Sequence, residues 1–171
     1  MRWAKVLVGG IDVNEISFAR ALEDSVKVYV ERELNYNREV IKEVLKLLRK
    51  QQSIYEKLLD QVQLQLGIFP EVSIEDMMEE KAWTSILEQY SSTKEGDIAS
   101  DFVVLTALYA LIEKTAIYYS QAAFYNPYPA GKHFYSALSH IKHGTRRRVD
   151  AIRRVNENKI WEKIGFAPYS V

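Results

Sequence analysis

Two histidines stand one helical turn apart in the stretch ALSHIKHGTRRRVDAIRRV, which runs from Ala137 to Val155. His140 and His143 are three positions apart, so in a helix both imidazoles project from one face. Imidazole is a frequent metal ligand, and it is also common as a hydrogen-bonding group on the surface or in the core of a protein. The stretch is therefore consistent with a metal-ligand pair, an anion-binding face or an ordinary surface helix.

One carboxylate lies within the most apolar segment of the chain, VVLTALYALIEKTAIYYSQAAFY. Glu113 is flanked in this segment by Leu111, Ile112 and Ala116. A buried carboxylate is unfavourable unless it is paired with a cation or bound to a metal. Glu113 is therefore predicted to be either a metal ligand or the partner of an arginine or of His143. Carboxylate and imidazole together suit iron or manganese.

Four arginines follow the histidines with a spacing of seven that can form one stripe on a helix. They are Arg146, Arg147, Arg153 and Arg154. Such a stripe could bind an anion, an RNA backbone or a protein partner, but no groove-reading motif accompanies it. Residues 71–97 carry eight acidic residues and two lysines, so pairing of the stripe with this acidic segment is the favoured interpretation.

The composition limits the class of protein. The 171 residues suit a single domain, 1–171, with one core, and the formal net charge of +0 gives no overall attraction to nucleic acid or membrane. The chain has no cysteine, which excludes disulfides, thiol nucleophiles and thiolate metal sites. No apolar run reaches the roughly 18 residues that a membrane span needs, so a cytoplasmic protein is expected.

Long segments without glycine or proline show a period near 3.6 and are predicted to be helices. The four longest are expected at 15–33, 38–66, about 97–125 and 132–158. A break at LNYNRE separates the first two, although one unbroken helix is the alternative. The connection 67–96 is expected to hold a shorter helix over MMEEKAWTSILEQY, and residues 159–171 form a tail that docks onto the body or a second subunit.

Two helical hairpins joined by a long crossover describe an all-α, ferritin-like four-helix bundle. The spacing Glu113-x-x-Ala116-x-x-Tyr119 resembles the ligand helix of rubrerythrins and related ferritin-like proteins. In that family the returning helix carries Glu-x-x-His. Here His143 falls at the position of the ligand histidine, and His140 occupies the place of the glutamate.

The first hairpin repeats part of this pattern. A Glu-x-x-Val-x-x-Tyr sequence begins at Glu23, but the returning helix has no Glu-x-x-His. The nearest uncharged polar residues opposite Glu23 are Gln51, Gln52 and Tyr55. Because the helix around Glu23 is more polar, exposure of this carboxylate is favoured over ligation.

The resemblance implies a non-haem iron or manganese protein in oxidative or peroxide chemistry, such as a di-iron-type oxidoreductase or peroxidase. Its metal ligands would be Glu113, His143 and His140, with Glu23 as a weaker one. The chain would associate as a homo-oligomer, a dimer above all. It would need an external electron donor, because the rubredoxin-like domain of rubrerythrins requires cysteines. The alternative is a ferritin-like bundle that has lost its metal site and acts as a structural module or as a protein or nucleic-acid interaction module.

Overall fold

The computed structural model describes residues 7–8, 11–35, 38–64, 68–94 and 96–165. Within these residues the chain is all-α, as predicted, apart from a short antiparallel pairing of β1 (Leu7–Val8) with β2 (Ile11–Asp12). The helices are α1 (Val13–Glu33), α2 (Glu39–Leu64), α3 (Ile74–Met78), α4 (Glu80–Ser92), α5 (Ile98–Tyr125) and α6 (Pro129–Lys163).

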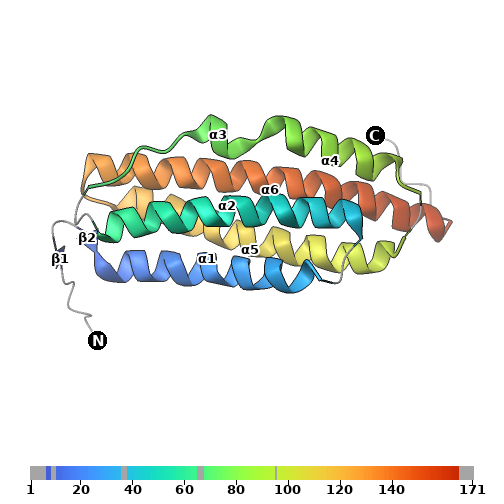
Figure 1. The fold of residues 1–171 in the computed structure, drawn as a ribbon, viewed down its shortest axis with the longest axis horizontal. Helices are drawn as coiled ribbons and strands as arrows, with labels where there is room; N and C mark the ends of the chain where they lie inside the picture. Colours follow the sequence, from blue (N-terminus) through green and yellow to red (C-terminus); the bar gives the residue numbers. More distant parts are fainter. Residues whose placement is uncertain (1–6, 9–10, 36–37, 65–67, 95, 166–171) are drawn as a thin grey trace.

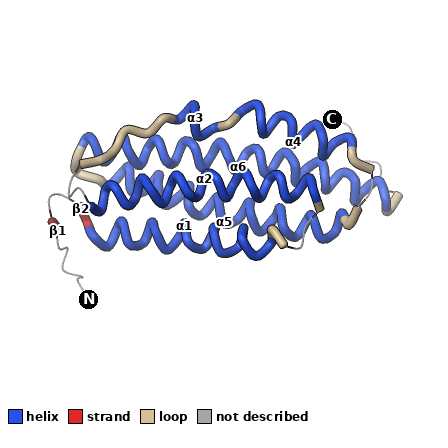
Figure 2. The backbone as a smooth tube through the Cα atoms, viewed as in Figure 1, coloured by secondary structure: helices blue, strands red, loops and turns tan. Residues whose placement is uncertain are grey.

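The four long helices α1, α2, α5 and α6 lie side by side in one bundle (Figures 1 and 2). α1 and α2 form one antiparallel hairpin, and α5 and α6 form the other. The connection that contains α3 and α4 runs the length of the bundle and packs on α6 and α2. As a result α5 runs parallel to α2 and antiparallel to α1.

The core forms where the apolar stripes of the four long helices meet. Leu45, Leu108, Ile112 and Val149 are among its fully buried members, one or two from each of α2, α5 and α6. Burying a side chain of this size stabilises a fold by about 1.5–3 kcal/mol. α4 covers this cluster from outside with Trp83, so the crossover is part of the core.

Local sequence signals explain where the helices begin. The Ser73 side chain caps α3 by accepting from the backbone N–H of Asp76. Asp97 caps α5 by accepting from the N–H of Ser100 at 3.0 Å. Pro129 begins α6 because a proline at the first helical position loses no hydrogen bond, and α6 is therefore longer than the predicted 132–158.

The crossover differs from the prediction at one residue. Glu79 has a left-handed backbone, with φ of 44°, and divides the predicted single helix into α3 and α4. α3 lies close to α6, since a Cβ added at Gly144 would lie 2.5 Å from Cε of Met78. Gly144, a glycine within α6, therefore leaves room for the Met78 side chain.

α5 has a buried inner face and an apolar outer face. By length and composition alone it is apolar enough to cross a bilayer, which the sequence prediction had excluded, and 39% of its most apolar 18-residue window is buried. In this fold the inner face of α5 forms part of the bundle core. Of the predicted tail, residues 159–163 form the last turn of α6, and residues 166–171 lie outside the described part.

Candidate functional site

A buried carboxylate lies at the centre of the bundle and is bound by one residue from each of the other three long helices. Glu23 of α1 is 1% exposed. Its Oε2 accepts from Lys142 Nζ of α6 and from Gln52 Nε2 of α2, both at 2.7 Å. Its Oε1 accepts from the Tyr119 hydroxyl of α5, also at 2.7 Å. The four helices therefore converge on a single polar centre.

The cation of this centre is Lys142, which is 2% exposed. Besides Glu23, its ammonium donates to Gln52 Oε1 at 3.1 Å and lies 3.8 Å from the centre of the Tyr55 ring. Burial lowers the pKa of Lys142, and the neighbouring Glu23 carboxylate opposes that change. A lysine that is buried with two hydrogen-bond acceptors and an aromatic face has the partners that its charge requires.

Lys142 reaches the centre because it lies on the face of α6 that points into the bundle. Leu138, Ile141, Thr145 and Val149 are buried, and Lys142 lies on the same face at a helical spacing. The neighbouring His143 is rotated by about 100° from that face and is only partly buried. The cation of the centre, Lys142, and the predicted metal ligand, His143, are therefore consecutive residues on different faces of α6.

A second buried polar group links the centre to the crossover. Gln51 donates to the Met77 carbonyl at 2.8 Å and accepts from the Thr145 hydroxyl at 3.2 Å. Gln51, which precedes Gln52 in α2, thus joins α2, α3 and α6 next to the Glu23 centre. These bonds satisfy amide groups that would otherwise be unfavourable in the core.

The Tyr55 hydroxyl is different because it is buried and has no hydrogen-bond partner among the described residues. Burial raises the pKa of Tyr55 and of Tyr119 well above 10.0, and the Glu23 carboxylate raises both further. Above pH 10 the unfolded chain releases these two protons while the folded chain keeps them, so stability falls as pH rises. The lowered pKa of folded Lys142 has the opposite effect, because it makes stability rise with pH. This effect ends at pH 10.5, the ordinary pKa of lysine.

We therefore expect the free energy of unfolding to fall steeply above pH 10.5, the ordinary pKa of Lys142. Each of the two tyrosines contributes up to about 1.4 kcal/mol per pH unit. Denaturant titrations of the parent and of Tyr55→Phe at a series of alkaline pH values measure this slope. The variant should lose the share of one tyrosine, up to about 1.4 kcal/mol per pH unit, while remaining about as stable as the parent at neutral pH. An unchanged slope would contradict the assignment.

The structure places the four predicted metal ligands in two separate regions. Glu23 is at the centre and buried, so the expectation that it is exposed is wrong. Glu113 is partly exposed, and its Oε1 accepts from Arg146 Nη1 at 2.7 Å and from the Tyr109 hydroxyl at 3.3 Å. This is the arginine pairing that the sequence left open for Glu113.

The two histidines lie on the outer side of α6. His140 is exposed, and Nε2 of the partly buried His143 is 3.4 Å from the Ser120 hydroxyl. Burial lowers the pKa of His143, and the charges of Arg146 and Arg147 lower it further. Among the described residues, no three histidine, aspartate or glutamate side chains are grouped in a way that could hold a metal ion.

Most arginines of the stripe pair with acidic residues of α5 and α6. Arg146 binds Glu113, whereas Arg153 and Arg154 bind Asp150 of the same helix at 2.7 and 2.9 Å. Arg147 is exposed. The predicted pairing with the acidic segment is made instead by a residue outside the stripe, since Arg148 pairs with Glu80.

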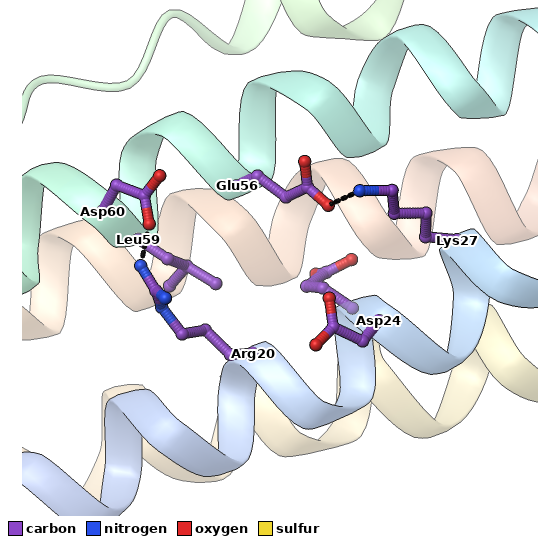
Figure 3. Close-up of a pocket in the computed structure, with 7 residues that line it drawn as sticks. Arg20, Asp24, Lys27, Glu56, Leu59 and Asp60 are labelled. Carbon is purple, nitrogen blue, oxygen red and sulfur yellow. Dashed lines mark hydrogen bonds and ion pairs between the residues drawn. The ribbon is translucent and has the colours of Figure 1, made fainter.

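A cavity of about 230 Å³ between α1 and α2 reaches Glu23 from outside (Figure 3). Its rim carries two ion pairs, one between Arg20 and Asp60 and one between Lys27 and Glu56 at 2.8 Å. The carboxylate of Glu23 is already bound by its three partners, so the cavity presents no uncompensated charge from the centre.

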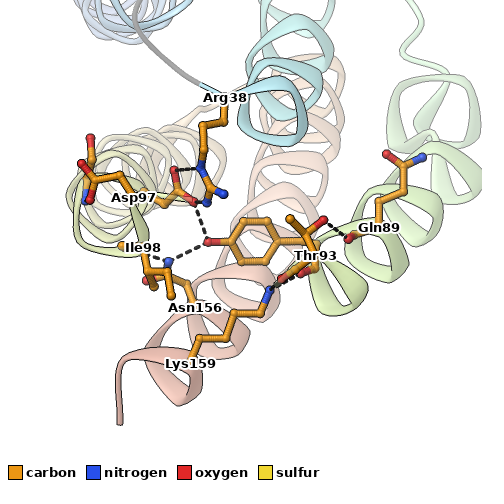
Figure 4. A network of polar contacts seen from close by, with 10 residues as sticks. Arg38, Gln89, Thr93, Asp97, Ile98, Asn156 and Lys159 are labelled. Atoms are coloured by element: carbon orange, nitrogen blue, oxygen red, sulfur yellow. Dashed lines mark hydrogen bonds and ion pairs between the residues drawn. The ribbon is translucent and has the colours of Figure 1, made fainter. Parts of the chain in front are cut away.

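A second polar network ties the crossover to the far end of the bundle (Figure 4). Asp101 of α5 is 1% exposed, pairs with Arg38 and accepts from the Tyr90 hydroxyl at 2.9 Å. Asn156 of α6 donates to the same hydroxyl at 2.6 Å, and Lys159 donates to the Thr93 carbonyl at 2.6 Å. These contacts fix α4 against α5 and α6, and Arg38 joins the chain just before α2 to α5.

The residues at the centre do not fit the iron or manganese that the resemblance implies. The Lys142 ammonium already binds the Glu23 carboxylate and the Gln52 amide oxygen, which are the groups that could ligate a metal. A metal ion at this position would be repelled by the positive charge of the ammonium. The other oxygen atoms there belong to the phenol groups of Tyr55 and Tyr119, which are protonated at neutral pH and whose pKa burial raises further. Comparison with family models, with curated proteins and with solved structures finds no match for this chain.

Proposed function

We propose that this chain is a ferritin-like bundle in which a lysine ammonium takes the place of a metal centre, and that it serves as a structural and interaction module. The fold supports the ferritin-like assignment through its two hairpins and the crossover between the parallel helices α2 and α5. The observation that carries the proposal is the buried bond between Lys142 Nζ and Glu23 Oε2 at 2.7 Å.

This centre has a structural role that needs no ligand. One carboxylate, one amide, one phenol and one ammonium satisfy each other and come from four different helices. Such a network favours one arrangement of the helices over others of similar hydrophobicity, because a shift of any helix leaves a buried charge without its partner. The centre therefore fixes the relative positions of the four helices.

The metalloenzyme alternative requires Glu113, His140, His143 and Glu23 to share a metal. Glu23 is bound to Lys142, and Glu113 is bound to Arg146 on the outer side of α5 and α6. Bringing these ligands together would break two ion pairs, one of them fully buried. The donor arrangement thus favours the structural role.

The metal content of the protein tests this proposal. The parent, His143→Ala and Glu23→Gln are produced with iron and manganese supplied and are analysed by elemental mass spectrometry. We expect the parent to hold no stoichiometric metal and its melting temperature to be unchanged by a chelator. About one or two metal ions per chain in the parent, lost in either variant, would establish the metalloprotein instead.

A further inference from the structure

The turn between α5 and α6 presents three aromatic side chains to solvent at one end of the bundle (Figure 1). Phe124, Tyr125 and Tyr128 are 76%, 77% and 43% exposed. The rings of Phe124 and Tyr125 are 5.0 Å apart in an edge-to-face arrangement. Exposed apolar side chains that are grouped, rather than scattered singly, mark surfaces that bind a partner. We call these three residues the aromatic tip.

The aromatic tip is held in one conformation by Asn126, which is itself buried. Its Oδ1 accepts from the backbone N–H of Tyr128 at 3.0 Å, and its own N–H donates to the Ala122 carbonyl at 3.0 Å. Gly131 leaves room for this side chain, since an added Cβ would overlap it. The turn is therefore ordered before a partner binds, so docking loses little conformational entropy.

The aromatic tip continues into exposed rows on α5 and α6. At about 100° per residue, Lys114, Ile117 and Phe124 lie within about 80° of each other around α5, and all three are exposed. Lys132 and Arg147 lie within about 60° of each other around α6, and both are exposed.

The two rows lie on the same side of the hairpin because side chains beside them meet. Ser120 Oγ of α5 is 3.4 Å from His143 Nε2 of α6. Ser120 is one helical turn from Ile117 and from Phe124, and His143 is one turn from Arg147. The rows and the aromatic tip therefore form one surface, which we call the hairpin face.

The charge of this part of the chain is one-sided. Residues 114–149 contain no aspartate or glutamate, but they contain six lysines and arginines. Three of these cations bind carboxylates outside this segment, namely Lys142, Arg146 and Arg148. The other three are the exposed cations of the hairpin face, Lys114, Lys132 and Arg147. The formal net charge of +0 thus includes a local excess of positive charge.

Carboxylates of other elements lie beside the hairpin face. Glu71 of the crossover lines a groove with His133 and Phe134, on the side of α6 that faces the crossover. Glu15 lies near Tyr118, whose hydroxyl donates to the Glu15 carbonyl on the side of α5 that faces α1. The hairpin face itself therefore keeps its positive charge.

We propose that the hairpin face docks on the surface of a membrane that contains anionic lipids, which rests on the interaction role proposed above and names its partner. Aromatic side chains favour the headgroup level of a bilayer, where the ring is buried and a tyrosine hydroxyl stays hydrated. The exposed cations of the face meet the anionic headgroups, and each strengthens binding by about fivefold.

The same features disfavour other partners. A two-fold homodimer through this face would bring the exposed cations of both copies into one interface, where like charges repel. Single-stranded nucleic acid is bound by aromatic side chains distributed along a cationic groove. Here the aromatic residues gather at one end of the face, and the apolar residue between the cations is the aliphatic Ile117.

Sedimentation with lipid vesicles tests the partner. The full-length parent is mixed with vesicles of phosphatidylcholine, with or without phosphatidylserine, at low and at high salt. We expect the parent to sediment with the phosphatidylserine vesicles at low salt and to be released at high salt, because salt screens the attraction. Vesicles of phosphatidylcholine alone should retain much less protein.

Single substitutions test the face. Lys132→Ala should weaken binding to the phosphatidylserine vesicles by about fivefold, and Phe124→Ser by about 10-fold. The matched controls are Lys57→Ala and Leu64→Ser, which change exposed residues of α2 and should bind as the parent does. All four side chains are exposed, so helix content measured by circular dichroism should stay unchanged.

Several results would overturn the proposal. One is a parent that stays in the supernatant with phosphatidylserine vesicles at low salt, and another is equal loss of binding in the α2 controls and the face variants. A parent that binds single-stranded RNA but no vesicles, or that buries the face in a stable dimer, would assign the face to a different partner. Metal content does not enter these measurements, so this inference can fail while the ammonium centre stands.

Discussion

Lys142→Met should lower the free energy of unfolding by about 3–5 kcal/mol, because it leaves the Glu23 carboxylate buried without its counter-charge. Glu23→Leu should lower it by a similar amount, because the Lys142 ammonium would then be buried without a carboxylate. Equilibrium denaturation of each variant by urea or guanidinium gives these values.

The double variant Glu23→Leu with Lys142→Met is the informative control. It removes both charges, so it should be more stable than either single variant, and the two single effects should not add. Tyr119→Phe removes one neutral hydrogen bond to Glu23 and should lower the free energy of unfolding by only about 1 kcal/mol. If Lys142→Met were within about 0.5 kcal/mol of the parent, the typical effect of a surface substitution, Lys142 would not lie in the centre.

Asp101→Ala should lower the free energy of unfolding by about 2–4 kcal/mol, the second largest effect that we expect. Asp101 is buried and joins the start of α5 to Arg38 and to the Tyr90 hydroxyl of α4. Its loss would leave the Arg38 guanidinium without its carboxylate and would loosen the crossover. Chemical denaturation measures the global effect, and hydrogen exchange of the α4 amides measures the local one.

Asp97→Ala provides a matched control in the same turn of the chain. Asp97 is exposed, and its side chain caps the first turn of α5, so its loss should lower the free energy of unfolding by only about 1 kcal/mol. Equal effects of the two substitutions would mean that Asp101 acts only as part of the helix start and that the network with Tyr90 contributes nothing.

The helices could be predicted because their signals are local. The break between α1 and α2, the cap at Ser73 and the start of α5 at Asp97 all follow from residues within one turn of the boundary. The division of the crossover at Glu79 could not be predicted, since a left-handed glutamate has no sequence signal and depends on the packing of α3 against α6.

The site was predicted in part. The sequence placed Gln51, Gln52 and Tyr55 opposite Glu23. Gln52 and Tyr55 lie there in the structure, whereas Gln51 binds Met77 and Thr145, and the sequence favoured an exposed Glu23. Lys142 was missed because a lysine between two histidines on a basic helix has the composition of a solvent-facing residue. The helical spacing of α6 could have indicated that Lys142 is buried. Position 142 lies on the same face as Leu138, Ile141, Thr145 and Val149, which are buried in the structure.

The most direct test of the ammonium centre is nitrogen-detected NMR of the lysine side chains at neutral pH. We expect one lysine ammonium group that exchanges slowly with water, is absent from Lys142→Met and titrates below 10.5. That resonance should persist when iron or manganese is added. A Lys142 ammonium that exchanges as fast as those on the surface, or that is displaced as the protein takes up stoichiometric metal, would contradict a buried ion pair of Lys142 with Glu23.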